Sequence, residues 1–230
     1  MVHVELPLAE SAHTTGTYHR ILDVAERLFA ERGIAGTSIR NITDQANVNV
    51  AAVNYHFDSK ENLVHKVVER RFIDLESARS QSLDEVQDRC ERERRAPATD
   101  ELVRALMEPL FHKTQSGDEG WLNFLNFVSR LAWEPGAEKY SPPSTSLEIF
   151  ERFDRMLQVA VPGLSQDKAR RSWRIAFMRA ASQQTLLMIG TVRSGRTPNA
   201  MAFVSDLNKL STEEIKNELI AFVAAGLAAK

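Results

Sequence analysis

Cysteine is almost absent from this sequence. The only one is Cys90, so no disulfide can form within the chain, and a reducing cytoplasm is the expected location. Cys90 lies in the charged run Asp88-Arg89-Cys90-Glu91-Arg92, where we interpret it as an incidental surface thiol, with a redox switch as the alternative.

Long hydrophobic runs and a targeting signal are lacking as well. Residues 1–16 carry Glu5 and Glu10 and have neither a basic segment nor a long apolar run, so they are predicted to form a flexible tail rather than a signal peptide. Elsewhere charges interrupt the apolar runs, so we expect no helix that spans a bilayer and no membrane partner.

Neither sign of charge is in excess. The 29 lysines and arginines against 31 aspartates and glutamates give a formal net charge of −2. A protein that coats nucleic acid along its whole surface is usually far more basic. Any potential that attracts DNA must therefore be local.

The residue patterns of common enzymes are also missing. None of the 6 histidines falls in a His-Glu-x-x-His pattern, and the chain has no Cys-x-x-Cys, Gly-x-Ser-x-Gly or phosphate-binding glycine loop. We therefore predict no catalytic residue, no metal site and no cofactor.

Apolar residues recur with a helical period nearly everywhere, and alternating strand patterns are absent, so the fold is predicted to be all-α. A fourth helix, capped by Asp58 or Ser59, should extend into the charged stretch 80–98, which ends in a linker and is the candidate domain boundary. The other predicted helices cover 17–32, 38–46, 50–57, 100–115, 119–133, 144–160, 165–192 and 211–228, with a shorter one near 200–209.

Residues 33–60 are the most informative segment. Gly33 suits a left-handed cap at the end of the first helix, and Thr37 is a good N-cap for the second. Asn47 can adopt the left-handed conformation that a tight turn needs, and Asn49 can cap the next helix. Two short helices joined by a tight turn are the layout of a helix-turn-helix, whose second helix lies in the major groove of DNA.

Three runs in this region make the pattern specific. Ala25–Gly33, Thr37–Arg40 and Tyr55–Lys60 fall where the TetR family of repressors has equivalent residues, and the segment resembles that family's DNA-binding domain. The resemblance implies an N-terminal three-helix helix-turn-helix domain and a larger C-terminal helical domain for ligand binding and dimerisation. We assign residues 1–16 to the tail, 17–62 to the first domain and 63–230 to the second.

The same resemblance carries DNA-binding roles onto single residues. Thr37 and Ser38 match phosphate-contacting positions, and the free N–H groups and dipole of a helix N-terminus attract anions there. Arg40 matches a residue that reaches a guanine or the backbone, and Tyr55, His56 and Lys60 match a phosphate clamp. The outward face of the recognition helix, which would read bases, comprises Asn49, Val50, Ala51, Ala52 and Asn54.

Physical chemistry supports parts of this assignment. Asn54 can pair bidentately with adenine, and Ala51 and Ala52 are small enough for close approach and for contact with thymine methyls. This chain departs from many family members by having Asn54 where an aromatic is common and Val50 where a polar or basic residue is common.

Each assignment has an ordinary structural alternative. His56 can be a core histidine, Tyr55 a packing residue and Lys60 plain surface charge. Arg40 can pair with Asp44 at a spacing of four residues on a helix surface.

The C-terminal domain is rich in large apolar residues. Aromatic and methionine side chains line adaptable apolar pockets, although plain core packing is the alternative for each of them. Arg130 and Gln183 could hold the polar group of a ligand. The candidate ligand-binding residues are Trp121, Phe124, Phe127, Arg130, Trp133, Phe150, Phe153, Phe177, Met178 and Gln183.

Two long apolar patterns predict a homodimer. Helices over about 165–192 and 211–228 would pair across a two-fold axis as a four-helix bundle, with a purely internal core as the alternative. The chain is also similar to the branch of the family that responds to fatty acids or acyl-coenzyme A, on Val48–Phe57, Arg174–Met178 and Phe222–Leu227.

Together these patterns predict a cytoplasmic dimeric repressor. It would bind a pseudo-palindromic operator in double-stranded DNA and leave it when a small apolar effector, with a fatty acid or acyl-coenzyme A as the candidate, binds. A ligand-independent regulator or an activator is one alternative, and a helical adaptor without DNA binding is another.

Overall fold

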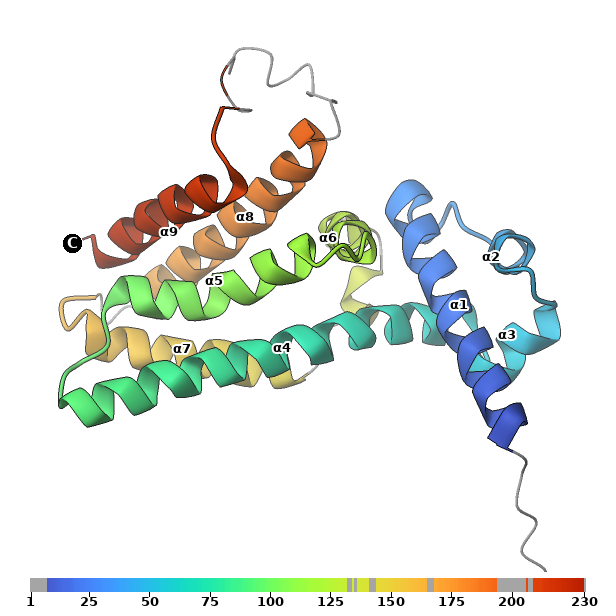
Figure 1. The fold of residues 1–230 in the computed structure, drawn as a ribbon, viewed down its shortest axis with the longest axis horizontal. Helices are drawn as coiled ribbons and strands as arrows, with labels where there is room; N and C mark the ends of the chain where they lie inside the picture. The colour runs from blue at the N-terminus through green and yellow to red at the C-terminus, as the bar shows by residue number, and fades with distance from the viewer. Residues whose placement is uncertain are drawn as a thin grey trace, which may run out of the picture. The chain divides into compact units, whose positions relative to one another are not determined.

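The computed structural model describes residues 8–131, 134, 136–140, 144–164, 168–193, 206 and 209–229, with side chains from residue 15 onward. Every regular element in these ranges is helical, which confirms the predicted fold class (Figure 1). The chain divides into two compact units. The N-terminal unit comprises Met1–Arg71 and Asn123–Pro142, and the C-terminal unit comprises Phe72–Leu122 and Pro143–Lys230.

The N-terminal unit is built on α1 (Leu8–Arg32), α2 (Ile39–Ala46), α3 (Val50–Phe57) and the first part of α4 (Lys60–Glu93). Each helix turns its apolar stripe inward, because removing these side chains from water is the main favourable term in folding. The buried stripe residues are Ile21, Ala25, Leu28, Phe29, Ile42, Ala46, Val53, Phe57, Leu63, Val64 and Val67.

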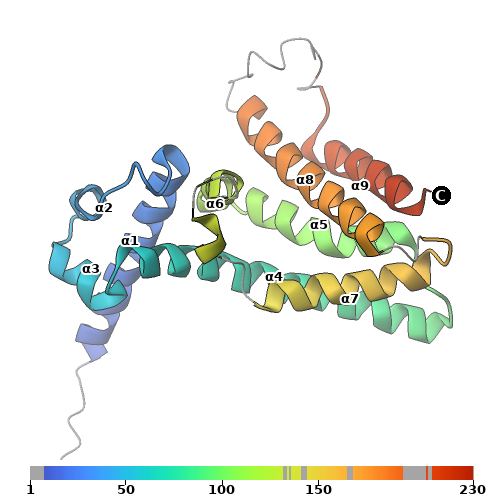
Figure 2. The ribbon, with the colours of Figure 1, turned by 180° about the vertical axis from the view of Figure 1, so that it is seen from behind.

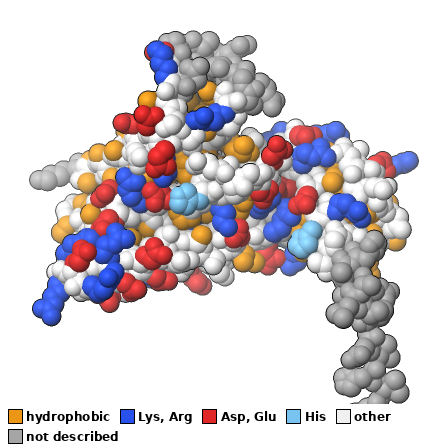
Figure 3. Space-filling view, in the orientation of Figure 1, with side chains coloured by type: hydrophobic (Ala, Val, Ile, Leu, Met, Phe, Trp, Pro, Cys, Tyr) orange, Lys and Arg blue, Asp and Glu red, His pale blue; other side chains and the backbone are white. Residues whose placement is uncertain are grey.

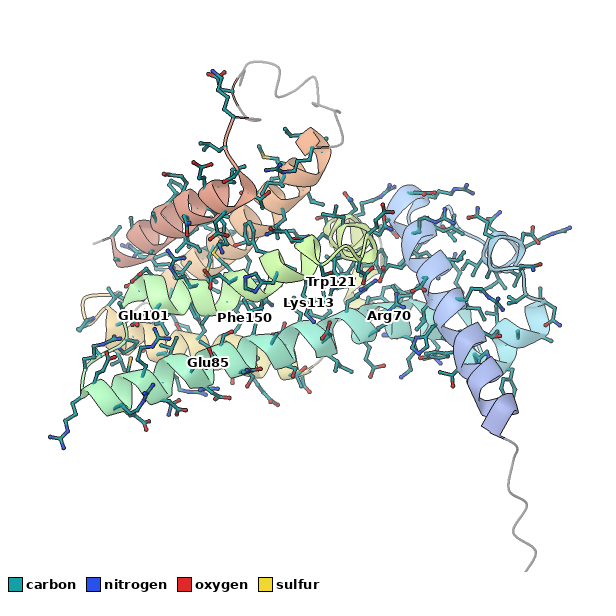
Figure 4. The ribbon with its side chains drawn as sticks, in the orientation of Figure 1. Arg70, Glu85, Glu101, Lys113, Trp121 and Phe150 are labelled. Carbon is teal, nitrogen blue, oxygen red and sulfur yellow. The ribbon has the colours of Figure 1, made fainter. Side chains whose placement is uncertain are left out.

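A buried carboxylate joins α1 to α4 inside this unit. Glu26 is 1% exposed and accepts hydrogen bonds from Arg71 Nε and Nη2, both at 2.8 Å, and from Arg70 Nη2 at 3.0 Å. Arg70, labelled in Figure 4, also pairs with the exposed Asp23 at 2.6 Å. Two guanidiniums around one carboxylate satisfy a charge that would otherwise be costly to bury.

The second segment of the N-terminal unit is the end of α6 (Gly120–Leu131) and the short 3-10 helix η1 (Ala137–Tyr140). Phe127 packs against Phe29 of α1, with ring centroids 5.5 Å apart. His65 of α4 lies beside Tyr140, with centroids 5.1 Å apart. These contacts explain why residues far along the chain belong to the same compact unit as α1–α3.

The C-terminal unit contains the rest of α4 together with α5 (Thr99–Gln115), α7 (Ser144–Ala160), α8 (Lys168–Arg193) and α9 (Thr212–Ala228). Within it α5 packs against α7, α8 and α9, and α8 lies beside α9 (Figures 1 and 2). A capping box at Ser211 begins α9, where the Ser211 hydroxyl accepts from Glu214 N at 3.2 Å. The apolar core of the C-terminal unit includes Leu83, Phe111, Phe153, Met178, Leu186 and Ile220.

One predicted helix boundary is wrong, the start of the first helix, whereas α4 extends into the charged stretch as predicted. The first helix begins at Leu8, so the predicted start near Thr17 was wrong, and residues 1–7 of the expected tail lie outside the described residues. The helix α4 runs without interruption to Glu93, which leaves Arg94–Ala98 as the linker before α5. The short helix expected near 200–209 falls almost entirely outside the described residues.

Cys90 is buried at 8% exposure, so its interpretation as a surface thiol was wrong. It lies on the inner side of α4, at the helical spacing set by Leu83 and Val86. The guanidinium of Arg95 covers it, with Nη1 3.6 Å from Sγ.

No helix in the described ranges is long and apolar enough to cross a membrane.

We predict that Glu26→Ala lowers the free energy of unfolding by about 3–5 kcal/mol, because it leaves two guanidiniums without their buried partner. The matched control is Asp23→Ala, which removes a carboxylate that is 64% exposed and pairs with the same Arg70. It should cost only about 0–1 kcal/mol. Urea denaturation followed by circular dichroism measures both, and equal losses would contradict a special role for the buried pair.

Candidate functional site

The N-terminus of α2 is closed by Ser38 rather than by the predicted Thr37. The Ser38 hydroxyl accepts from Asn41 N at 3.1 Å, and the Asn41 side chain accepts from Ser38 N at 3.0 Å, which forms a capping box. Ser38 is exposed, so this helix end can be reached from solvent.

Thr37 was expected to contact phosphate at the helix N-terminus, but it is buried and its backbone N–H donates to Ile34 O at 3.2 Å. It is 1% exposed, and its hydroxyl donates to Gly33 O at 2.9 Å and lies 3.2 Å from Leu28 O. A hydroxyl that satisfies carbonyls at the end of α1 cannot also reach a phosphate. Thr37 instead anchors the turn between α1 and α2.

The turn between α2 and α3 has the predicted chemistry. Asn47 adopts the left-handed conformation with φ 51° and ψ 53°, and Asn49 is the N-cap of α3, its side chain accepting from Ala52 N at 2.8 Å. Because asparagine tolerates the left-handed region better than most residues, this turn sets the angle between the two helices at little conformational cost.

The helix α3 presents one face to solvent and buries the other. Val53 and Phe57 are buried, whereas Val50 is 48% exposed and Tyr55 78% exposed. Ala51 and Asn54 are exposed as well, and Ala52 is half-buried. The exposed set repeats every three to four residues along one side, as a helix that lies in a groove requires.

Aromatic rings support the end of α3 from α1. Tyr18 stacks on Phe57 with centroids 4.9 Å apart and meets His56 edge-on at 5.8 Å. His56 is half-buried, so it is not a core histidine, and its ring lies beside that of Tyr55 at 5.1 Å. The two polar rings therefore occupy a defined position at the helix end.

Arg40 is exposed on α2, and its guanidinium forms no ion pair with any side chain in the described ranges. The surface pair with Asp44 that the spacing allowed is not formed. Its positive charge is therefore available to a partner outside this chain.

Lys60 is not plain surface charge. Its ammonium donates to Ile34 O at 2.5 Å. The amide of the same Ile34 donates to Oε1 of Glu134, which follows α6, at 3.3 Å. Burial lowers the pKa of the Lys60 ammonium, while the charge of Glu134 opposes that shift. Lys60 thus holds the turn that precedes α2, a role that the sequence pattern did not indicate.

The candidate ligand-binding residues separate into several environments. Trp121, Phe124, Phe153 and Met178 are buried, and Phe150 and Gln183 are half-buried. Trp133 lies outside the described residues.

Three of these candidates are corrected. Phe127 packs on Phe29 in the N-terminal unit, so it belongs to that unit's core and not to a pocket in the C-terminal unit. Arg130 donates from Nη1 to Glu31 O at 3.0 Å and to Ala30 O at 3.3 Å, which caps the end of α1. Phe177 is 61% exposed on α8, where its ring lies 5.7 Å from that of Trp173.

Sequence reasoning missed a buried polar cluster in the C-terminal unit. Glu76 of α4 is 3% exposed and accepts from Arg79 Nη1 at 3.0 Å and from the Ser146 hydroxyl of α7 at 3.1 Å. The only signal in the sequence was the spacing of three residues between Glu76 and Arg79, which is common on solvent-facing helices.

Positive and negative side chains are interspersed over the described part of the face in Figure 3. The described residues contain no group of histidine, cysteine or acidic side chains arranged to hold a metal ion. The exposed side of α2 and α3, which carries Ser38, Arg40, Val50, Ala51, Asn54 and Tyr55, is the candidate nucleic-acid interface.

Comparisons with known proteins agree with this geometry. Residues 21–67 match the model of the bacterial regulatory proteins of the tetR family, and residues 104–226 match a Tetracyclin repressor-like C-terminal domain. The HTH-type transcriptional repressor KstR2 of Rhodococcus jostii is 38% identical over 68 residues, which cover 30% of this chain and 33% of that protein. The match therefore spans about a third of that relative's length.

Longer matches are weaker in identity. The HTH-type transcriptional regulator AcrR of Shigella flexneri is 27% identical over 150 residues, which cover 62% of this chain and 63% of that protein. The structure of the ketosteroid transcriptional regulator KstR2 of Mycobacterium tuberculosis aligns with a TM-score of 0.54 at 18% identity, over 93% of this chain and 95% of that one, and so shows the same fold. With both family models matched over most of its length, the chain belongs to the TetR family of bacterial regulatory proteins.

Proposed function

We propose that this protein is a dimeric, sequence-specific transcriptional repressor that leaves its operator when a small apolar effector binds. The observation that carries the proposal is α3, whose buried side anchors it through Val53 and Phe57 while Val50, Ala51 and Asn54 face solvent. A helix supported in this way is suited to the major groove, where Asn54 can read adenine and Ala51 can touch a thymine methyl.

Phosphate contacts would come from both sides of this helix. The exposed N-terminus of α2 at Ser38 offers free N–H groups and the positive end of a helix dipole. Arg40 adds an unpaired guanidinium, and Tyr55 and His56 add hydrogen-bonding rings at the end of α3. The Lys60 ammonium has three protons and uses one of them in its bond to Ile34 O. It can therefore donate to a phosphate while it continues to hold that turn.

The dimer would form through α8 and α9, as predicted for about 165–192 and 211–228. Trp173, Phe177 and Phe222 are 65%, 61% and 73% exposed on these two helices. The rings of Trp173 and Phe177 lie 5.7 Å apart. Exposed large aromatic side chains favour a protein partner, and aromatic residues dominate the energetics of such interfaces. A second copy of the chain would bring two recognition helices to half-sites about 34–36 Å apart.

The effector site would lie in the C-terminal unit, among Trp121, Phe153 and Met178. The helix α6 continues from that unit into the N-terminal one, where Arg130 caps the last carbonyls of α1. Effector binding that shifts α6 would therefore act on the end of α1. The shift cannot exceed the effector's differential affinity for the two states.

Several finer points stay predictions. A fatty acid or acyl-coenzyme A effector rests on the sequence resemblance, and cytoplasmic location rests on the single cysteine and the sequence of residues 1–16. An activator or a ligand-independent regulator would use the same DNA-facing helix. The family to which the chain belongs consists of regulators and makes the helical adaptor the weakest of the alternatives.

We predict that selection from random duplex DNA at physiological salt enriches a pseudo-palindrome, because a two-fold dimer reads two equal half-sites. Arg40→Ala and Tyr55→Ala should each weaken binding to the selected site about tenfold or more, since each removes a phosphate or base contact from an exposed position. Binding is measured by fluorescence anisotropy across a salt series.

The matched control is Arg92→Ala, which removes an exposed arginine near the end of α4. Its affinity for the selected duplex should equal that of the native protein. Absence of any enriched site, or equal losses from Arg40→Ala and Arg92→Ala, would count against the proposed DNA interface.

We predict that Phe177→Glu and Phe222→Glu each raise the dimer dissociation constant at least about a hundredfold, because each puts a charge into a desolvated aromatic contact. Sedimentation equilibrium measures the constant directly. The control is Leu147→Glu on α7, where Leu147 is 64% exposed but lies outside α8 and α9. A dimer that survives both aromatic substitutions means that another surface joins the protomers.

A further inference from the structure

The C-terminal unit buries a carboxylate that is only half satisfied. The Oε1 of Glu76 accepts from Arg79 Nη1 at 3.0 Å and from the Ser146 hydroxyl at 3.1 Å. The Oε2 of the same carboxylate is shielded from solvent and has no hydrogen-bond partner among the described residues. Because an unpaired buried acceptor destabilises the protein, such an atom in a native structure needs an explanation, and a donor on a bound molecule is one.

Arg79 holds this carboxylate in position from a second direction. Its Nε donates to Leu106 O of α5 at 3.0 Å while Nη1 binds Glu76, so the guanidinium is tied to two helices. Its remaining nitrogen, Nη2, has no acceptor among the described residues. Burial lowers the pKa of the Arg79 guanidinium, and the charge of Glu76 opposes that shift.

An aromatic ring and a second arginine border the same cluster. The guanidinium carbon of Arg79 lies 5.6 Å from the ring centroid of Phe150, and that of Arg179 lies 4.7 Å from it. Phe150, which comes from α7, is labelled in Figure 4. The guanidinium of Arg179 forms no hydrogen bond or ion pair with any described residue, and part of it is exposed.

The charges of the cluster select among ligand groups. One carboxylate and two guanidiniums leave one net positive charge, which disfavours a cationic ligand. An anionic group would be attracted by that charge, but it has no proton to give to Glu76 Oε2. An ether or ester oxygen accepts without donating, so it would also leave Oε2 unpaired.

A neutral hydroxyl meets every requirement. Its proton can go to Glu76 Oε2, and its oxygen can accept from the free nitrogen of Arg79 or from Arg179.

We propose that the effector of this regulator is an apolar molecule that carries a hydroxyl group, recognised by Glu76, Arg79 and Arg179 beside Phe150. This inference rests on the proposed function in one respect, namely that the bound molecule regulates DNA binding. The binding site itself does not depend on DNA, because all of its residues lie in the C-terminal unit. Its selectivity comes from the unpaired oxygen, which turns away ligands that lack a donor.

The test compares three ligands of similar size by isothermal titration calorimetry on the full chain without DNA. They are 1-octanol, its isomer heptyl methyl ether, which has the same atoms but no donor, and octanoate. The native protein should bind 1-octanol at least about tenfold more tightly than either of the others. Equal binding of the alcohol and the ether, tighter binding of octanoate, or no binding of 1-octanol overturns the proposal.

A substitution tests whether Glu76 is the residue that accepts the hydrogen bond from the ligand hydroxyl. In Glu76→Gln the amide oxygen must face Arg79, which only donates, so the amide nitrogen takes the place of Oε2. The preference for the alcohol over the ether should then fall below about threefold, because the site now donates. Glu85→Gln is the matched control, since Glu85 lies exposed on the same helix and accepts from Gln81 Nε2 at 3.3 Å (Figure 4). That variant should keep the native preference, and its loss there would refute the assignment to Glu76.

The wild-type comparison decides the question even if Glu76→Gln fails to fold. The DNA-binding experiments above are independent of it. A protein that binds the selected duplex but ignores the hydroxyl refutes this inference alone, and one that prefers 1-octanol but enriches no duplex refutes the repressor function alone.

Discussion

The turn that follows α1 is the constraint on which the DNA-facing geometry depends. Gly33 adopts φ +73°, and its amide donates to Phe29 O at 2.9 Å. A side chain there would be strained, and its Cβ would come within 2.5 Å of Glu134 Oε1. Glycine therefore permits both the reversal of the chain and the close approach of a carboxylate, and the start of α2 follows from that reversal.

Four side chains then hold the turn from different elements. Thr37 satisfies Gly33 O, Lys60 satisfies Ile34 O, Glu134 accepts from Ile34 N, and Arg130 covers Glu31 O. These side chains supply partners for backbone groups around a helix end, although Ile34 O also accepts from Thr37 N at 3.2 Å. Because Arg130 lies on α6 and Lys60 begins α4, the position of the recognition helix is linked to two helices that also enter the C-terminal unit. In the proposed function, α4 and α6 would be the elements through which an effector changes DNA affinity.

The sequence predicted most of this fold because local chemistry decides it. Asparagine is favoured at left-handed turn positions and at N-caps, which Asn47 and Asn49 occupy, and the stripe that ends in Val53 and Phe57 favours one buried face. The extension of α1 to Leu8 was missed because its residues show no clear apolar stripe. The exposed side of Phe177 was missed for a different reason. An apolar residue on a helix looks the same in sequence whether it covers a core or a partner.

The roles of the long-range polar residues could not be predicted at all. Thr37 and Arg130 were assigned to DNA and ligand because threonine at a helix start and arginine on an apolar helix often serve there. Their true partners lie 4 to 100 residues away in the chain, as the bonds to Gly33 O and Ala30 O show. No periodicity encodes such a pairing. The resemblance to the family located the helices well, but it carried roles onto side chains that this chain uses to close its own helix ends.

Two buried carboxylates, Glu26 on α1 and Glu76 on α4, illustrate how a structural site and a proposed ligand site differ in one chain. Both oxygens of the Glu26 carboxylate are bound by Arg71, and Arg70 adds a third bond, so this carboxylate is satisfied even though the buried Nε of Arg70 has no partner among the described residues. Glu76 has a comparable burial and a comparable arginine, yet one oxygen has no donor. Evolutionary retention of a buried charge for stability alone would favour the first arrangement, because an incomplete network is less stable than an apolar core. A donor that completes the network would stabilise whichever conformation holds Glu76, Arg79 and Ser146 together. In the proposed site, the half-satisfied carboxylate is therefore the position where the stability of the protein and its response to a ligand are connected.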